Sequence, residues 1–175
     1  YRGRFLQCDG YDAYDKLTAL DRPEGPWQLV HCWTHVRRRF VKRFESDRSP
    51  IAEEMLRQIA LLYQVEKTVR GTNAAARLAA RREHAAPIVA ALKPWLEMQL
   101  SRIPQKSLLA EDIRYTLAHW PGLIRFLDDG TVTFHHHEVV GAKMTRKRLK
   151  ALKYPKHVIS DVGQLVFLHM RFHGF

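Results

Sequence analysis

The stretch between residues 50 and 120 constrains the fold of this chain most strongly, because one helix signal follows another along it. It opens on Ser49-Pro50, where serine can cap a helix and proline suits the first helical turn. Apolar side chains then return to a single helical face, at Ile51, Met55, Ile59, Leu62 and Val69. This spacing predicts a long helix that begins at residue 50.

Breaker residues divide the rest of this stretch into further helices. Gly71 ends the first run, and Thr72 or Asn73 can cap the next. The prolines at positions 87 and 94 interrupt the helical pattern without destroying it. Another helix is expected over residues 105–119, before the Trp-Pro-Gly sequence at 120–122. We therefore predict that residues 50–120 are wholly α-helical.

The first 49 residues have a different pattern. Residues 4–9 and 27–32 read as short strands, and residues 11–20 read as a short helix between them. A second helix is expected directly after the second strand, from Trp33. Strand, helix, strand and helix in this order favour an α/β fold.

The charge of the chain indicates a polyanionic partner. The net charge is +11 and the pI is about 10, while a hydrophobic content of 46% is typical of a globular protein. Nucleic acid is the first candidate partner, because the lysines and arginines occur in clusters. A basic surface that only keeps the protein soluble is the alternative.

The two cysteines and the absence of long apolar runs predict a location in a reducing cytoplasm. Two cysteines are too few for a disulfide framework. No run approaches the roughly 20 apolar residues that cross a membrane, and no signal peptide is visible. We expect no membrane partner. The chain starts at Tyr1, which suggests a cut inside a domain.

Asp9 is the first candidate functional residue. A carboxylate at the carboxyl end of a strand is well placed to hold Mg²⁺, which prefers oxygen ligands. In two-metal phosphoryl transfer, such carboxylates hold the ions that activate the attacking oxygen and stabilise the leaving one. Asp-Gly is also a common turn pair, and composition alone favours that interpretation.

Cys32 and His35 form a C-x-x-H pair at the junction between the second strand and the following helix. The spacing could place a thiolate and an imidazole near one Zn²⁺, but a structural zinc site needs four ligands and no second pair lies at a typical distance. We therefore disfavour zinc and prefer a buried thiol beside a hydrogen-bonded histidine. A nucleophilic Cys–His pair is conceivable, but nothing else supports hydrolysis.

A basic helix follows this pair. It carries five cations that could contact DNA phosphates, namely Arg37, Arg38, Arg39, Lys42 and Arg43. Positions 35, 38, 39 and 42 share one face, whereas Val36, Phe40 and Phe44 lie on another that resembles a core face. A merely solvated face is an equally good interpretation. Two weaker basic groups lie at residues 77–82 and 146–148.

The last 41 residues change character again. They open with His135-His136-His137, which cannot all bind one metal ion unless they lie in a loop, because adjacent side chains point in different directions. Seven basic residues and no acid then follow from Lys143 to Lys156. The final apolar stretch, residues 163–175, could form a strand.

Taken together, these motifs resemble the catalytic region of bacterial insertion-sequence family 66 transposases. The resemblance runs almost continuously from residue 1 to about residue 134, through segments such as YRGRFLQCDGYDAY, HCWTHVRRRF and LAHWPGLIRFLDDGTV. It implies a partial ribonuclease-H-like α/β fold that is interrupted by a large all-helical insertion. The implied parts are a catalytic core (1–49), the insertion (50–121), a return to the core (122–134) and a diverged basic tail (135–175).

The resemblance also implies roles for individual residues. The family uses two aspartates and a glutamate to bind two Mg²⁺ (or Mn²⁺) ions for DNA strand cleavage and strand transfer, and Asp9 matches the second aspartate. Cys32 and His35 match the family's C-x-x-H motif and would support the site. Arg37 to Arg39 match its arginine-rich helix. The implied partners are the DNA ends of the insertion element, the target DNA and other transposase subunits. The implied location is the bacterial nucleoid.

Two departures from the family pattern bear on catalysis. The family's first aspartate lies on an upstream strand, before Tyr1. The positions of its glutamate and the following arginine align with Val140 and Gly141. The nearby Glu138 lies two positions earlier, and two residues rotate a helix by about 200°, so Glu138 would face away from the site.

We therefore expect a truncated and frameshifted transposase fragment with little or no catalysis; a genuinely diverged tail is the alternative. The competing function is a catalytically dead DNA-binding or interaction module. A metal-binding regulator that uses Cys32, His35 and the histidine run is a third possibility.

Overall fold

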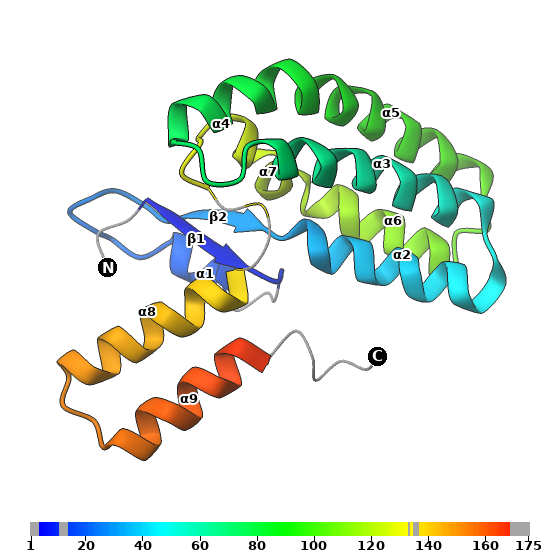
Figure 1. The fold of residues 1–175 in the computed structure, drawn as a ribbon. Helices are drawn as coiled ribbons and strands as arrows, with labels where there is room; N and C mark the ends of the chain where they lie inside the picture. The colour runs from blue at the N-terminus through cyan, green and yellow to red at the C-terminus, as the bar shows by residue number, and fades with distance from the viewer. Residues whose placement is uncertain (1–3, 11–13, 133, 135–136, 169–175) are drawn as a thin grey trace. The chain divides into compact units, whose positions relative to one another are not determined.

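The computed structural model describes residues 4–10, 14–132, 134 and 137–168, together with most of their side chains. The chain divides into two compact units, residues 1–134 and residues 135–175. Each unit is described by itself below, and both are drawn in Figure 1. No described helix is long and apolar enough to cross a membrane.

A small parallel sheet begins the first unit. Strand β1 (Phe5–Cys8) pairs in parallel with strand β2 (Gln28–His31), with Phe5 opposite Gln28 and Cys8 opposite His31. Parallel strands need a crossover connection, and helix α1 (Asp15–Thr18) with the loop after it provides one. The carboxyl ends of both strands therefore lie at the same edge of the sheet.

Helix α2 (Trp33–Asp47) follows β2 after one residue, Cys32. It ends at Arg48, which adopts a left-handed conformation and donates its backbone N–H to the Phe44 carbonyl. Helix α3 (Pro50–Thr68) starts at once, because the Ser49 hydroxyl accepts a hydrogen bond from the Ala52 N–H. The predicted helix start at Ser49-Pro50 is confirmed.

The next helix runs from Ala74 to Arg102 in three sections, α4 (Ala74–Ala80), the π turn η2 (Arg81–Ala85) and α5 (Ala86–Arg102). The Asn73 side chain caps its first turn through the Ala76 N–H. Pro87 has no N–H to donate, and its ring would collide with a carbonyl one α-helical turn earlier. The wider π turn just before Pro87 accommodates this, so the helix continues as predicted.

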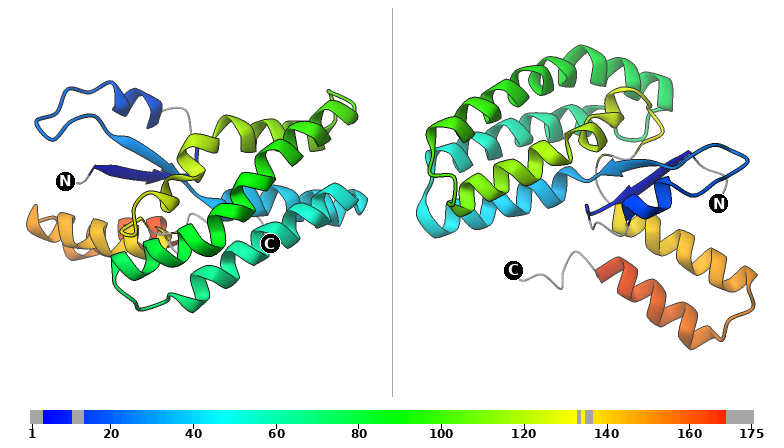
Figure 2. Two further views of the ribbon diagram at one scale, coloured as in Figure 1. Left: turned by 90° about the horizontal axis from the view of Figure 1, so that it is seen from above. Right: turned by 180° about the vertical axis from the view of Figure 1, so that it is seen from behind.

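Four helices then enclose one hydrophobic core. Helix α6 (Leu108–Ala118) is followed by the short helix α7 (Trp120–Leu123) and the 3-10 turn η3 (Arg125–Leu127). Helices α2, α3, α5 and α6 lie side by side in a closed ring of contacts (Figures 1 and 2). Their buried side chains include Trp33, Phe40, Ile59, Leu96 and Ile113. The helices predicted over residues 50–120 are therefore confirmed.

The predicted partial ribonuclease-H-like α/β fold is wrong for this structure. The described residues are mostly helical, and they contain two four-residue strands in a single small sheet. Residues 122–134 add no described strand, because Pro121 occupies the first turn of α7 and starts a helix there. Short apolar runs such as this one do not distinguish a strand from a helix by periodicity.

The second unit contains a helical hairpin made of α8 (His137–Ala151) and α9 (Lys156–Leu168). The strand suggested for residues 163–175 is wrong over residues 163–168, which belong to α9, and the rest lies outside the described residues. The predictions for His135 and His136 also lie outside them. The backbones of residues 138–141 are helical, but their side chains are not described.

A buried ion pair fastens the long helix to its neighbours. The Arg81 guanidinium donates to both carboxylate oxygens of Glu66, at 2.6 and 2.9 Å, and the two side chains are almost fully buried. Arg81 also donates to the backbone carbonyls of Phe126 and Asp129, at 3.2 and 3.3 Å. One side chain therefore joins η2 to α3, to η3 and to the loop after η3.

Glu66→Gln should destabilise the first unit by about 3 kcal/mol, because it leaves the Arg81 charge buried without its counter-ion. Urea unfolding followed by tryptophan fluorescence measures the change. Glu54→Gln is the matched control, because Glu54 pairs with Arg57 at the surface of the same helix. Equal unfolding midpoints for the two variants would contradict this account.

His31 packs the end of β2 against the junction of α6 and α7. Its Nδ1–H donates to the carbonyl of His119 at 3.2 Å, and the two imidazole rings meet edge to face with centroids 4.5 Å apart. Gly122 lies against the His31 ring, where any Cβ would collide with Nδ1. Burial lowers the pKa of His31, and the hydrogen bond to His119 only partly opposes this shift.

The lowered pKa of His31 predicts a loss of stability in mild acid. Because the unfolded chain binds the proton more tightly, His31 contributes stability above pH about 6.5 that is lost as the pH falls below it. His31→Asn keeps a donor near the Nδ1 position but cannot titrate, so it should flatten the pH dependence of the unfolding midpoint between pH 7 and 5. A parallel pH dependence in wild type and variant would refute this.

Candidate functional site

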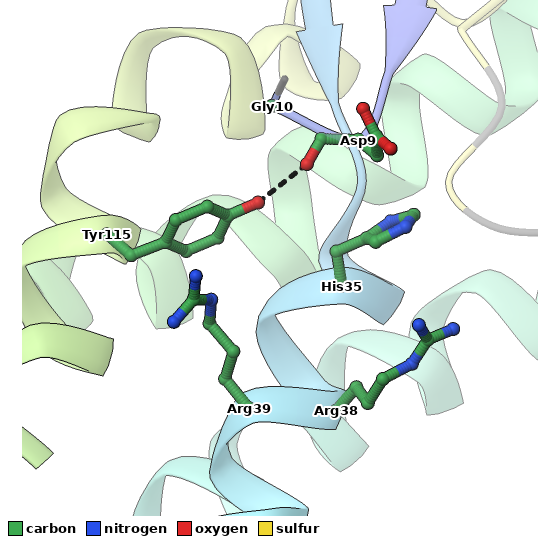
Figure 3. Close-up of a pocket in the computed structure, with 6 residues that line it drawn as sticks. All are labelled: Asp9, Gly10, His35, Arg38, Arg39 and Tyr115. Atoms are coloured by element: carbon green, nitrogen blue, oxygen red, sulfur yellow. Dashed lines mark hydrogen bonds between the residues drawn. The ribbon is translucent and has the colours of Figure 1, made fainter. Parts of the chain in front are cut away.

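A pocket of about 300 Å³ lies where the carboxyl end of β1 meets helices α2 and α6. Six residues line it, namely Asp9, Gly10, His35, Arg38, Arg39 and Tyr115. Figure 3 shows the Asp9 side chain on the same side as the His35 ring, while the two arginines rise from the next turn of α2. One carboxylate therefore shares a pocket with two guanidinium groups.

Gly10 fixes the direction of the chain after Asp9. Its φ of 85° lies in the left-handed region, which side chains other than glycine rarely adopt. A Cβ at this position would also lie 2.6 Å from Nε2 of His119 and 2.8 Å from the Tyr115 hydroxyl. Asp9 and Gly10 therefore follow β1 as part of the pocket wall.

Two side chains from the end of α6 contact the backbone of Asp9 and Gly10. The Tyr115 hydroxyl donates to the backbone carbonyl of Asp9 at 2.7 Å, and Nε2 of His119 lies 3.3 Å from the carbonyl oxygen of Gly10. Burial raises the pKa of Tyr115, so its hydroxyl keeps the donated proton at neutral pH. Sequence reasoning missed both residues, although their i, i+4 spacing places them on one helical face.

Two of the five predicted DNA-binding cations form ion pairs with an acid inside the fold. Arg39 donates to Asp112 at 3.0 Å and lies 4.0 Å above the Tyr115 ring. Arg43 is 7% exposed and donates to the second oxygen of Asp112 at 3.2 Å. Both arginines thus join α2 to α6, and the buried Asp112 carboxylate receives both bonds.

The other three predicted cations lie closer to solvent. Arg37 and Lys42 are exposed on α2, and Arg38 is partly exposed at the pocket. Arg38 and Lys42 are four residues apart, so they follow the same helical face as His35. This face extends the positive charge of the pocket along α2.

The two cysteines lie next to the pocket in sequence, since Cys8 precedes Asp9. Cys8 and Cys32 are buried and are not joined in a disulfide, and Cys32 directly precedes the first residue of α2. Burial raises the pKa of Cys8 to about 11, so this thiol stays protonated at neutral pH and is a poor metal ligand. His35 lines the pocket three residues after Cys32.

The donor set around Asp9 is incomplete for a two-ion site. Among the described residues, no three histidine, cysteine, aspartate or glutamate side chains gather where they could hold a metal ion. Asp9 offers one carboxylate, which suits a single Mg²⁺ that keeps water ligands and shares a phosphate oxygen. It does not suit two ions held by the protein alone.

Comparison with known proteins places this chain in a family. The family described as "Transposase IS66 family" matches residues 1–137. Three similar curated proteins come from Sinorhizobium fredii (strain NBRC 101917 / NGR234) and are named uncharacterized proteins y4jD, y4qI and y4hP. They are 43%, 38% and 30% identical over 73%, 73% and 74% of this chain.

The chain spans about a quarter of the length of these relatives, covering 25%, 24% and 26% of them. No solved structure matches it. The family match extends from the strand before Asp9 to the start of α8 and includes the whole pocket. The predicted resemblance is confirmed, and the chain belongs to the IS66 family of transposases.

Proposed function

We propose that this chain is a DNA-contacting part of an IS66-type transposase, with Asp9 as one ligand of a divalent cation. The pocket itself carries the proposal, because it places a carboxylate beside Arg38 and His35 at the end of a strand. The ancestral reaction of the family is Mg²⁺-dependent cleavage and joining of DNA strands. Membership of the family supports the assignment of DNA and a divalent metal as partners.

The charges of the pocket suit a phosphodiester. A carboxylate alone repels a phosphate, but a divalent cation shared between them turns this repulsion into attraction. The cations of α2 then extend the positive surface along the DNA backbone. We assign phosphate contacts to Arg37, Arg38 and Lys42, and we leave out Arg43, which is buried against Asp112.

We also propose that this chain does not cleave DNA on its own. Cleavage by this chemistry needs two ions, and Asp9 is the one acid among the described residues that line the pocket. Cys32 and His35 support the wall of the pocket, in this proposal, without binding zinc. The DNA-contacting surface and the metal-dependent cleavage reaction are therefore separable by experiment.

The double variant Arg38→Gln/Lys42→Gln should weaken binding to a 30-base-pair duplex and lower its salt dependence. Each lost phosphate contact should reduce the slope of log K against log[salt] by about 0.9. Fluorescence anisotropy between 50 and 300 mM NaCl measures both quantities. The matched control Lys67→Gln/Lys93→Gln removes the same charge from exposed positions on α3 and α5. If both variants lose the same slope, the surface of α2 has no special role.

Asp9→Asn should separate metal binding from phosphate binding. At constant ionic strength, 5–10 mM Mg²⁺ should raise the affinity of the wild-type chain for DNA several-fold, and the variant should not respond, because an amide does not hold the cation as a carboxylate does. Without Mg²⁺, the variant should bind DNA slightly more tightly, since one repulsive charge is gone.

The same samples test catalysis. Wild-type protein incubated with element-end DNA and Mg²⁺ or Mn²⁺ should leave the strands intact. Strand cleavage that disappears in Asp9→Asn would overturn the proposed inactivity. Identical Mg²⁺ responses in wild type and variant would favour the competing function, a DNA-binding module in which Asp9 is only a turn residue.

A further inference from the structure

The hairpin of α8 and α9 presents a dense group of positive charges outside the pocket at Asp9. Six cations in it are exposed, namely Lys143, Lys147, Arg148, Lys150, Lys153 and Lys156. Asp161 is the one acidic residue among the described side chains of this unit. The family match ends at residue 137, so this group lies beyond it.

The spacing of the lysines places them in a line. Lys143, Lys147 and Lys150 are separated by four and three residues, so they share one face of α8. At 1.5 Å per residue, this line extends about 10 Å along the helix before it reaches the loop. Lys153 and Lys156 continue the positive charge through the loop into α9.

The loop holds a cation in an unfavourable backbone conformation. Lys153 N–H donates to the Lys150 carbonyl and Tyr154 N–H donates to the Leu149 carbonyl, which is a Schellman helix end. Lys153 has a φ of 59° at the position where glycine is favoured. A lysine here costs stability but places its charge at the tip of the hairpin.

Helix stability does not account for the cations that follow the loop. Lys156 and His157 open α9, where a cation opposes the helix dipole, and the first turn contains no acid. Arg146 is different, because its side chain packs against Gly163 of α9 and joins the two helices. Arg148 and Lys150 suit the last turn of α8, where the helix dipole favours cations, but the cations that open α9 are better explained by an external polyanion.

Tyr154 adds a stacking surface to this positive loop. Its side chain is 49% exposed, and it lies between Lys153 and Lys156. An aromatic ring among lysines is the combination that binds single-stranded nucleic acid, because the ring stacks on an unpaired base while the lysines contact phosphates. An anionic membrane is the competing partner, because the hairpin also exposes Met144, Leu152 and Leu165, and binding to phosphatidylserine vesicles distinguishes the two.

We propose that the α8–α9 hairpin is a second nucleic-acid site, which binds a single strand through its lysines and stacks one base on Tyr154. This proposal does not rest on the function proposed for the pocket at Asp9. The two sites lie in different units of the chain, and each has its own exposed cations. Variants of one unit therefore leave the other intact as an internal reference.

The first test measures the binding of the full chain to fluorescein-labelled dT30 by anisotropy over a series of NaCl concentrations. The triple variant Lys147→Gln/Lys150→Gln/Lys153→Gln should bind at least about 10-fold more weakly at low salt. Its slope of log K against log[salt] should fall by about 2, at about 0.7 for each single-strand phosphate contact. The charge-matched control changes three exposed cations of the first unit, and it is Arg57→Gln/Lys67→Gln/Lys93→Gln.

The second test concerns the loop. Tyr154→Ala should weaken dT30 binding at least about 5-fold with the salt slope unchanged, and Tyr154→Phe should retain the affinity, because stacking needs only the ring. Lys153→Gly should raise the thermal stability of the hairpin, since glycine relieves the positive φ, but should lower the salt slope by about 0.7. A purely structural role predicts the stability change without the change in DNA binding.

Three outcomes would overturn the proposal. They are equal losses in the hairpin variant and the charge-matched control, unchanged affinity in Tyr154→Ala, and hairpin-dependent binding to phosphatidylserine vesicles without dT30 binding. The variant Arg38→Gln/Lys42→Gln separates this proposal from the preceding one. If only the hairpin variant loses affinity, the proposed DNA surface on α2 is wrong and the proposed hairpin site is supported. If only the α2 variant loses affinity, the proposed hairpin site is wrong and the surface on α2 is supported.

Discussion

The pocket depends on the ion pairs that Asp112 forms inside the fold. The buried carboxylate of Asp112 binds Arg39 and Arg43, two residues one turn apart on α2, and so fixes α6 against that helix. Tyr115 lies one turn further along α6, and its hydroxyl holds the backbone of Asp9. The position of Asp9 is thus set by a chain of contacts that begins at an ion pair in the core, since removing either side of a buried pair is strongly destabilising.

Local signals were sufficient to predict the helices from α2 to α6, because a helix start depends on neighbours in sequence. Ser49 and Asn73 cap helices as expected, and the helix survives Pro87 through one widened turn. The fold class could not be predicted in this way. The extent of a sheet depends on pairing between distant segments, and residues 122–134 carry an apolar run whose short length suits a strand or a helix equally.

The candidate site, too, could be predicted only where its residues are neighbours in sequence. Asp9 and His35 come from motifs that are contiguous in sequence, whereas Tyr115 and His119 reach the backbone of Asp9 and Gly10 from a helix about a hundred residues away. The basic pattern of α2 was also visible, but sequence spacing could not show which arginines meet an acid. Arg43 is buried by Asp112, a partner 69 residues away along the chain.

The π turn at residues 81–85 sets the rotational phase between the two ends of the long helix. Before it, Arg77 donates to the Gly130 carbonyl; within it, Arg81 holds Glu66; after it, Val89 and Leu92 face the core. A π turn holds one residue more than an α-helical turn. A one-residue deletion here would therefore leave an ordinary α-helical turn and restore the collision between the Pro87 ring and a carbonyl one turn earlier, although three of the five residues in the turn are exposed. The length of this segment is thus constrained by the proline that follows it as well as by its buried side chains.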